Sequence, residues 1–140
     1  ATILAQENLA GITGAGLYSN FQARAEKVKD DFVAYLIEAK WQGIKVAAYG
    51  AAAKGNTLLN FGGVRPDLLP YVVDLNPAKQ GKYLPGSRVP IVSEDHLRDH
   101  RPDRVVILPW NLRDEVMRQL SYIREWGGKF VAAVPVLEEL

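Results

Sequence analysis

Apolar residues recur along this chain in two kinds of pattern, one typical of helices and one typical of buried strands. From 17 to 42 they return at helical spacing, as Phe32 and Leu36 do, which predicts a long amphipathic helix. The preceding stretch, 1–16, holds three glycines and is expected to be an irregular lead-in or linker. The folded domain is therefore expected to span 17–140.

Continuous apolar runs predict buried strands, and the stretches between them have helical patterns. The runs lie at 44–49, 69–74, 104–108 and 129–134, and the helical stretches lie at 56–61, 93–100 and 111–126. Alternation of strands with helices favours a parallel sheet covered on both faces. We therefore predict an α/β fold, a Rossmann-like three-layer domain preceded by a long N-terminal helix, with a mainly parallel sheet of about four strands in the order 2-1-3-4.

In that order the chain reverses direction between the first and third strands, and open α/β sheets bind ligands at such a point. The turn after the first strand, at Gly50, and the segment after the third strand, 109–111, are expected to flank one crevice. The loop 75–90, rich in proline and glycine, is expected to lie beyond the carboxyl end of the second strand.

The turn between the first strand and the next helix, 50–55, consists of glycine and alanine apart from Lys54. Small residues let a ligand approach the backbone, and the free N–H groups at a helix start favour an anion. This pattern predicts a phosphate-binding site, with Tyr49, Lys54, Asn56 and Thr57 as ligand contacts. Alternatively, the small residues serve only to let the helix pack closely on the strand.

Neither common phosphate-binding motif is complete in this turn. A Walker A loop fails because Asn56 stands where its lysine should be. The dinucleotide fingerprint lacks its second glycine, which weakens the case for NAD but leaves it as an alternative. Asp74 ends the second apolar run, at about the distance where such folds place an acid that binds ribose or sugar hydroxyls.

Two further groups of residues are candidates for ligand contacts. Trp110 and Asn111 leave the third strand at the ligand-binding end, where they could stack on a ring and bind hydroxyls. Alternatively, Trp110 packs under the loop and Asn111 caps the next helix. Lys79 and Tyr83 lie in the loop 75–90 with two more cations, which suits an anionic substrate or an ordinary charged surface.

Composition argues against several classes of function. The formal net charge of the 140 residues is +1 without a basic stripe, so no nucleic-acid partner is expected. No stretch approaches the roughly 20 apolar residues of a membrane span, so no membrane partner is expected. The absence of cysteine fits a cytoplasmic location. His96 and His100 are spaced as metal ligands can be, but they lie in a highly charged stretch, and no metal site is expected.

Taken together, several ordered segments resemble one family of enzymes. They are Tyr49 to Asn60, Val72 to Gly86, Pro90-Ile91, Pro102-Asp103, Trp110-Asn111-Leu112, Glu115-Val116 and Gly127 to Val131. From about residue 20 to Pro135, the chain resembles the C-terminal domain of S-adenosylmethionine-dependent sugar C-methyltransferases.

The resemblance implies a substrate-side domain that follows a separate N-terminal methyl-donor domain and helps enclose a nucleotide-linked keto-deoxysugar. In such enzymes a proton beside the sugar ketone is removed, and the enolate carbon attacks the donor methyl group. The family's tyrosine and histidine acid/base groups lie upstream of the matched region, and no histidine precedes His96 here. We therefore expect this chain to hold no catalytic residue and no S-adenosylmethionine site, and to be inactive alone. Since it begins with Ala1, a fragment, a processed chain and a free-standing relative are all open.

The turn chemistry and the resemblance together rank the candidate contacts to the nucleotide-sugar. The first rank is Tyr49, Lys54, Asn56 and Thr57, and the second is Asp74, Lys79, Tyr83, Trp110 and Asn111. The alternative function is a stand-alone nucleotide- or dinucleotide-binding module without methyltransferase activity, which would bind phosphate at the small-residue turn and ribose at the acid of the second strand.

Overall fold

The computed structural model describes the backbone of residues 9–140 and the side chains of residues 22–140. Its helices are α1 (Leu9–Trp41), α2 (Ala53–Gly62), α3 (Glu94–His100) and α4 (Arg113–Gln119), with the 3₁₀ helices η1 (Trp110–Leu112) and η2 (Ser121–Trp126) on either side of α4. Its strands are β1 (Val46–Tyr49), β2 (Val72–Val73), β3 (Ile91–Val92), β4 (Arg104–Ile107), β5 (Lys129–Ala132) and β6 (Glu138–Glu139).

All six strands belong to one sheet, in the order β3-β2-β1-β4-β5-β6. Strands β1 to β5 run parallel, and β6 pairs antiparallel with β5. In the middle of the sheet, Ala48 is in register with Val72 on one side and Val106 on the other. The predicted α/β fold is confirmed, and the predicted order 2-1-3-4 is confirmed as β2-β1-β4-β5.

The apolar pattern does not predict the two edge strands, β3 and β6. Strand β3 has two residues and follows a proline-rich loop, and it joins the sheet because the Val72 N–H donates to the Pro90 carbonyl at 2.9 Å. Strand β6 consists of two glutamates, and the chain is held there by paired backbone hydrogen bonds between Phe130 and Leu140. Both strands depend on pairing across the sheet, which leaves no local signal in the sequence.

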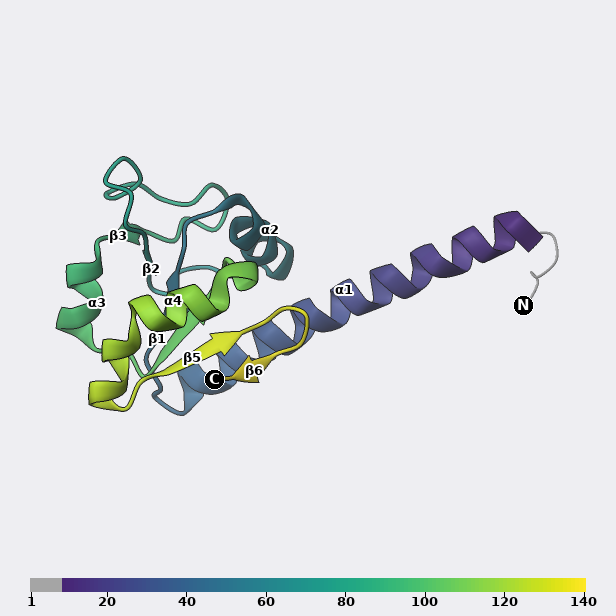
Figure 1. The fold of residues 1–140 in the computed structure, drawn as a ribbon. Helices are drawn as coiled ribbons and strands as arrows, with labels where there is room; N and C mark the ends of the chain where they lie inside the picture. The colour runs from purple at the N-terminus through teal and green to yellow at the C-terminus, as the bar shows by residue number, and fades with distance from the viewer. Residues whose placement is uncertain (1–8) are drawn as a thin grey trace.

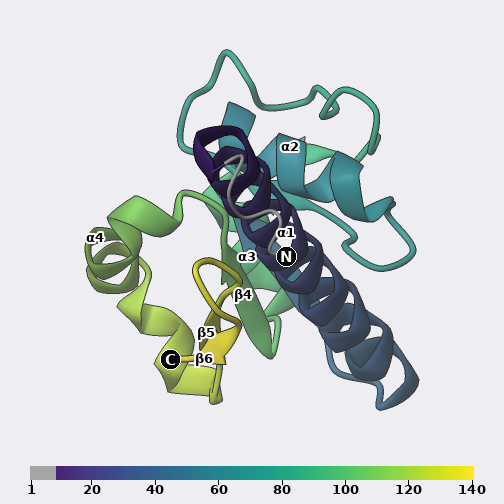
Figure 2. The same ribbon diagram turned by 90° about the vertical axis from the view of Figure 1, so that its right-hand side faces the viewer.

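Helices cover both faces of the sheet and make three layers, with α1 and α2 on one side and α4 on the other (Figure 2). On the first face, α1 buries Phe32 and Leu36 against strand residues such as Ala48. On the second face, α3, α4 and η2 bury residues such as Ile123 against Tyr49 and its neighbours. Because successive strand residues point to opposite faces, adjacent residues of β1 enter different cores.

Helix α1 begins at Leu9, so residues 9–16 are helical, although their glycines predict an irregular lead-in. The rest of that predicted lead-in, 1–8, lies outside the described residues. Each glycine disfavours a helix by only about 1 kcal/mol. The packed end of α1 already supplies the helical nucleus, and extending a helix is much easier than starting one. At about 1.5 Å per residue, the 33 residues of α1 extend for about 50 Å, and the helix projects far beyond the sheet (Figure 1). The division into 1–16 and 17–140 stays a prediction.

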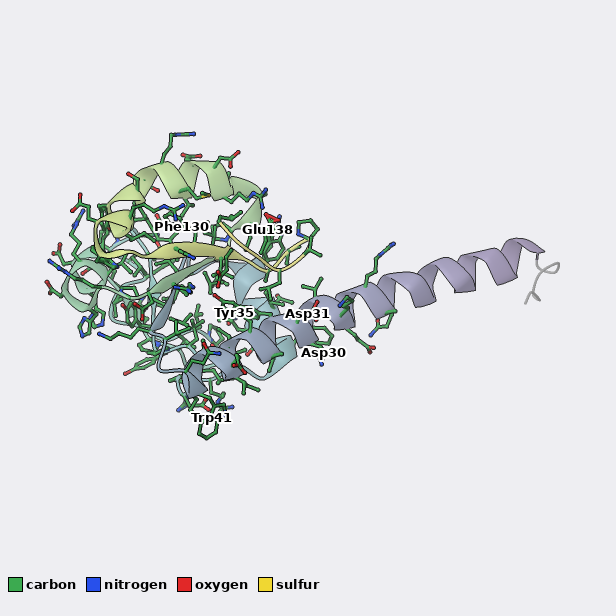
Figure 3. The ribbon with its side chains drawn as sticks, turned by 90° about the horizontal axis from the view of Figure 1, so that it is seen from below. Asp30, Asp31, Tyr35, Trp41, Phe130 and Glu138 are labelled. Atoms are coloured by element: carbon green, nitrogen blue, oxygen red, sulfur yellow. The ribbon has the colours of Figure 1, made fainter. Side chains whose placement is uncertain are left out.

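Two aromatic side chains in the carboxyl half of α1 differ in their surroundings, since one contacts the sheet and the other is exposed to solvent. Tyr35 reaches toward the last strand (Figure 3), where its hydroxyl donates a hydrogen bond to Glu139 Oε2 at 2.6 Å. Trp41, near the end of the helix, is 80% exposed and points away from the domain (Figure 3). None of the described helices is long and apolar enough to cross a membrane.

The segment 111–126, predicted as one helix, consists of the end of η1, then α4 and η2. Leu120 and Ile123 are both fully buried, and the Ile123 N–H donates to the Leu120 carbonyl at 3.0 Å. The tighter 3₁₀ winding puts residues three apart on the same face, so both side chains reach the sheet. Helix α3 begins at Glu94, one residue after the predicted start of that helix, and the side chain of its N-cap residue, Ser93, makes no capping hydrogen bond.

Candidate functional site

The small-residue turn after β1 lies directly against the segment that follows β4. Gly50 has a φ of +97°, and its backbone N–H donates to the Val73 carbonyl at 2.8 Å. A Cβ at this position would lie only 2.5 Å from Cδ of Pro109. The turn and the segment 109–111 are therefore neighbours at the carboxyl end of the sheet, as predicted, and only glycine fits between them.

Close packing explains a second glycine of the turn. A Cβ on Gly55 would lie 2.6 Å from Cβ of Leu108, so α2 can approach the end of β4 only without a side chain there. The amino end of α2 has no capping side chain, because its N-cap residue is Ala52. No cap side chain among the described residues therefore accepts from the N–H groups of the first turn, a setting that favours an anion. The packing interpretation and the anion interpretation are compatible.

Asp74 and Lys79 hold the turn in place. The Asp74 carboxylate accepts hydrogen bonds from the N–H groups of Ala51, at 2.8 Å, and Asn76, at 2.9 Å. The Lys79 ammonium donates to the Ala51 carbonyl at 2.8 Å and lies 4.0 Å from the Asp74 carboxylate, whose side chain is 16% exposed. Both residues thus shape the backbone of the turn, and a direct ligand contact for either stays a prediction.

One face of α2 borders an apolar groove with a volume of about 560 Å³. The side chains that α2 contributes recur at 54, 57, 58 and 61, the spacing of a single helix face. The opposite walls come from α1, from η1 and from the residues that follow β5. We call this the α1–α2 groove, and its main lining residues are Arg24, Val28, Lys54, Thr57, Phe61 and Trp110.

Three predicted site residues, Lys54, Thr57 and Trp110, meet in the α1–α2 groove. The Lys54 ammonium lies 5.8 Å from the centroid of the Trp110 ring, and the Thr57 hydroxyl donates to the Ala53 carbonyl at 3.0 Å. No carboxylate lines the groove, and neither Lys54 nor Arg24 forms an ion pair with a described carboxylate. The groove is therefore apolar in its lining and positive in its charge.

Three other predicted site residues lie outside the lining of this groove. Asn56 is on α2, and its side-chain oxygen is buried without a hydrogen-bond partner among the described residues. Asn111 is exposed in η1 and does not cap α4, whose N-cap residue is Leu112. Tyr83 is 66% exposed in the loop 75–90. Ligand contacts of these three residues stay predictions.

Tyr49 ends β1 on the face of the sheet opposite the α1–α2 groove. Its ring belongs to the core under α3 and α4, and its hydroxyl lies 3.4 Å from Oε1 of Gln119. Burial raises the pKa of Tyr49, and the negative charges of Asp74 and Glu94 raise it further. Because the sheet separates this ring from the groove, Tyr49 and Lys54 do not line the same site.

A second cavity, of about 370 Å³, lies at the amino ends of the strands, and Tyr71 and His100 contribute to its lining. The Tyr71 side chain is 8% exposed, its hydroxyl has no hydrogen-bond partner among the described residues, and burial raises its pKa to about 12.

His96 and His100 stack face to face, 3.9 Å apart between centroids. Burial and the charge of His100 lower the pKa of His96.

Sequence reasoning missed the groove residues Arg24, Val28 and Phe61. The face of α2 is visible in the sequence, since Lys54 and Phe61 are seven residues apart with apolar Leu58 between them. The wall from α1 has no such signal, because its residues are distant in the chain and resemble any other part of an amphipathic helix.

These features define a three-layer α/β domain with a ligand-sized groove at the carboxyl end of its parallel strands. The model of the C-methyltransferase C-terminal domain family matches residues 1–135. The chain is 35% identical over 135 residues to C-methyltransferase NovU of Streptomyces niveus, a match that covers 96% of this chain and 32% of that protein. The chain therefore belongs to the C-methyltransferase C-terminal domain family, and the resemblance seen in the sequence is confirmed.

The chain spans about one third of the length of this curated relative. A solved structure, UDP-D-quinovosamine 4-dehydrogenase from Vibrio fischeri, has a TM-score of 0.47 and 15% sequence identity, over 69% of this chain and 93% of that chain.

Proposed function

We propose that this domain binds a nucleotide-linked keto-deoxysugar and presents it to a methyl donor held by another domain of the same polypeptide. The donor is S-adenosylmethionine, bound outside the present chain. Membership of the C-methyltransferase C-terminal domain family supports this function, as does a relative about three times as long as the matched region. The observation that carries the proposal is the meeting of Lys54, Thr57 and Trp110 at one groove beside the amino end of α2.

The groove suits binding better than proton transfer. Lys54 and the uncapped start of α2 place positive charge where a diphosphate can accept hydrogen bonds. C-methylation of a keto-sugar also needs a base for the proton beside the ketone. None of the described residues that line the α1–α2 groove is a histidine or a carboxylate, so we assign that step to the domain that holds the methyl donor.

Isothermal titration of the chain with UDP- and dTDP-linked 4-keto-6-deoxyglucose tests the proposal. At least one of these nucleotide-sugars is expected to bind, whereas S-adenosylmethionine is expected to show no heat of binding. Lys54→Ala should weaken the binding roughly tenfold, since it removes a charged contact to phosphate. Lys129→Ala is the matched control, because Lys129 is an exposed cation at the amino end of β5, outside the groove.

Two results would contradict the proposal. One is equal affinity of the wild type and Lys54→Ala for the nucleotide-sugar. The other is tight binding of NAD in the same titration with no binding of either nucleotide-sugar, which would favour the dinucleotide-binding module instead.

A further inference from the structure

The α1–α2 groove has an aromatic ring beside a cation at two places. The Lys54 ammonium lies 5.8 Å from the centroid of the Trp110 ring, and the Lys29 ammonium of α1 lies 5.4 Å from that of the Phe61 ring. Lys54 lies in the first turn of α2, where the helix dipole adds positive potential. Phe61 lies seven residues later, about 10 Å along the helix axis, with Leu58 between them. The groove therefore fits an elongated ligand that carries both anionic groups and an aromatic ring, with the anionic groups nearest the start of α2.

The aromatic side chains of the groove suit a planar aromatic ring. Trp110 and Phe61, which is 47% exposed, both contribute aromatic side chains to the lining. Base–aromatic stacking is a strong and sequence-tolerant contact in nucleotide-binding proteins. The groove volume of about 560 Å³ also lies within the range of small-molecule sites.

A sugar ring suits the same space poorly. Its hydroxyls need hydrogen-bond partners when they leave water, and burial without them costs free energy. Thr57 is the one hydroxyl that α2 contributes to the lining, and it already donates to the carbonyl of Ala53. The sugar is therefore better accommodated outside the groove.

We propose that the α1–α2 groove takes the nucleoside diphosphate half of the nucleotide-sugar. The base packs against Trp110 and Phe61, the diphosphate lies at Lys54 and the amino end of α2, and the keto-sugar stays outside, where a methyl donor can reach it. This inference rests on the proposed function. It also means that α1 lines the nucleotide site, through Arg24 and Val28.

Titration calorimetry with dTDP, UDP, thymidine and inorganic pyrophosphate tests the assignment of each end. One of the two nucleoside diphosphates is expected to bind at least about tenfold more tightly than thymidine or pyrophosphate, because it spans both ends. Trp110→Leu and Phe61→Ala should each weaken that binding about tenfold or more, as the loss of a stacked ring does. Trp110→Tyr, which keeps an aromatic ring, should restore most of the affinity.

Two controls separate the groove from the rest of the surface. Trp41→Leu changes a tryptophan that is 80% exposed and lies outside the groove, so it should leave the affinity unchanged. Lys54→Ala should weaken the nucleoside diphosphate but not thymidine, because thymidine has no phosphate. Thermal unfolding of each variant shows whether it is folded, and Phe61→Ala carries the test if Trp110→Leu is not.

The outcomes distinguish this inference from the proposed function. If the nucleotide-sugar binds and both Trp110→Leu and Phe61→Ala bind it as tightly as the wild type, the groove assignment is wrong while the proposed function stands. If pyrophosphate binds as tightly as the nucleoside diphosphate, the base has no place in the groove. If neither nucleotide-sugars nor nucleoside diphosphates bind at about 1 mM, both proposals fail.

Discussion

Replacing Gly50 with alanine tests the contact between the two segments that flank the candidate site. The φ of +97° is a left-handed backbone conformation, which costs a residue with a Cβ about 1–2 kcal/mol. The new Cβ would also lie 2.5 Å from Cδ and 2.9 Å from Cγ of Pro109, and overpacking of this kind costs about 1–3 kcal/mol. The proline ring is tied to the backbone and cannot rotate away, so the two costs add. We expect the free energy of unfolding to fall by about 2–5 kcal/mol.

Gly63→Ala is the matched control for this experiment. Gly63 has a φ of +68° and would have nothing within 4 Å of an added Cβ, so it pays only the backbone cost of about 1–2 kcal/mol. Urea unfolding of both variants, followed by far-UV circular dichroism, gives the two free energies. Gly50→Ala should be the less stable by about 1–3 kcal/mol. Equal losses would refute the contact with Pro109 and the close approach of the turn to that segment.

Three more substitutions test single features of the structure. Tyr71→Phe should raise the free energy of unfolding by about 1 kcal/mol, because it removes a buried hydroxyl without a partner. Since the pKa of Tyr71 is raised to about 12, above its ordinary 10, the wild type should lose stability as the pH rises from 10 to 12, and the variant should lose less in thermal unfolding over this range. Hydrogen bonds from Tyr35 and Arg104 lower the pKa of Glu139 below its ordinary 4.5, so its contribution is lost as the pH falls through the lowered value, and Glu139→Gln should show a smaller loss in acid unfolding. Asp74→Ala should lower the free energy of unfolding by about 2–4 kcal/mol without ligand, because two backbone N–H groups lose a charged acceptor, and an unchanged urea midpoint would contradict that role.

Sequence patterns predict the central sheet well because its signals are local. Strands β1 and β2 are apolar throughout, and β4 and β5 are apolar after a charged first residue, as is typical of parallel strands buried on both faces. The glycine at position 50 is also a local signal, since a tight turn needs a residue without a Cβ. By contrast, the two glutamates of β6 carry no pattern, because backbone pairing with β5 is what makes them a strand.

The candidate site shows the same division. Lys54, Thr57 and Trp110 are recognisable from the sequence, because they follow strand ends at the ligand-binding edge of an α/β sheet. Tyr49 and Asp74 follow the same rule, yet Tyr49 points into the opposite core and Asp74 binds the backbone of the turn. A strand buried on both faces has no alternation from which the direction of a side chain can be read.

The α/β class, the order of the four central strands and the place of the small-residue turn can therefore be predicted from the residues alone, because they depend on patterns within short stretches of chain. The folded structure was needed to find that Arg24 and Val28 of α1 line one groove with Lys54 and Phe61 of α2 and with Trp110. That arrangement depends on how the helices pack on a common sheet, through contacts between residues distant in the chain, and no local pattern encodes it.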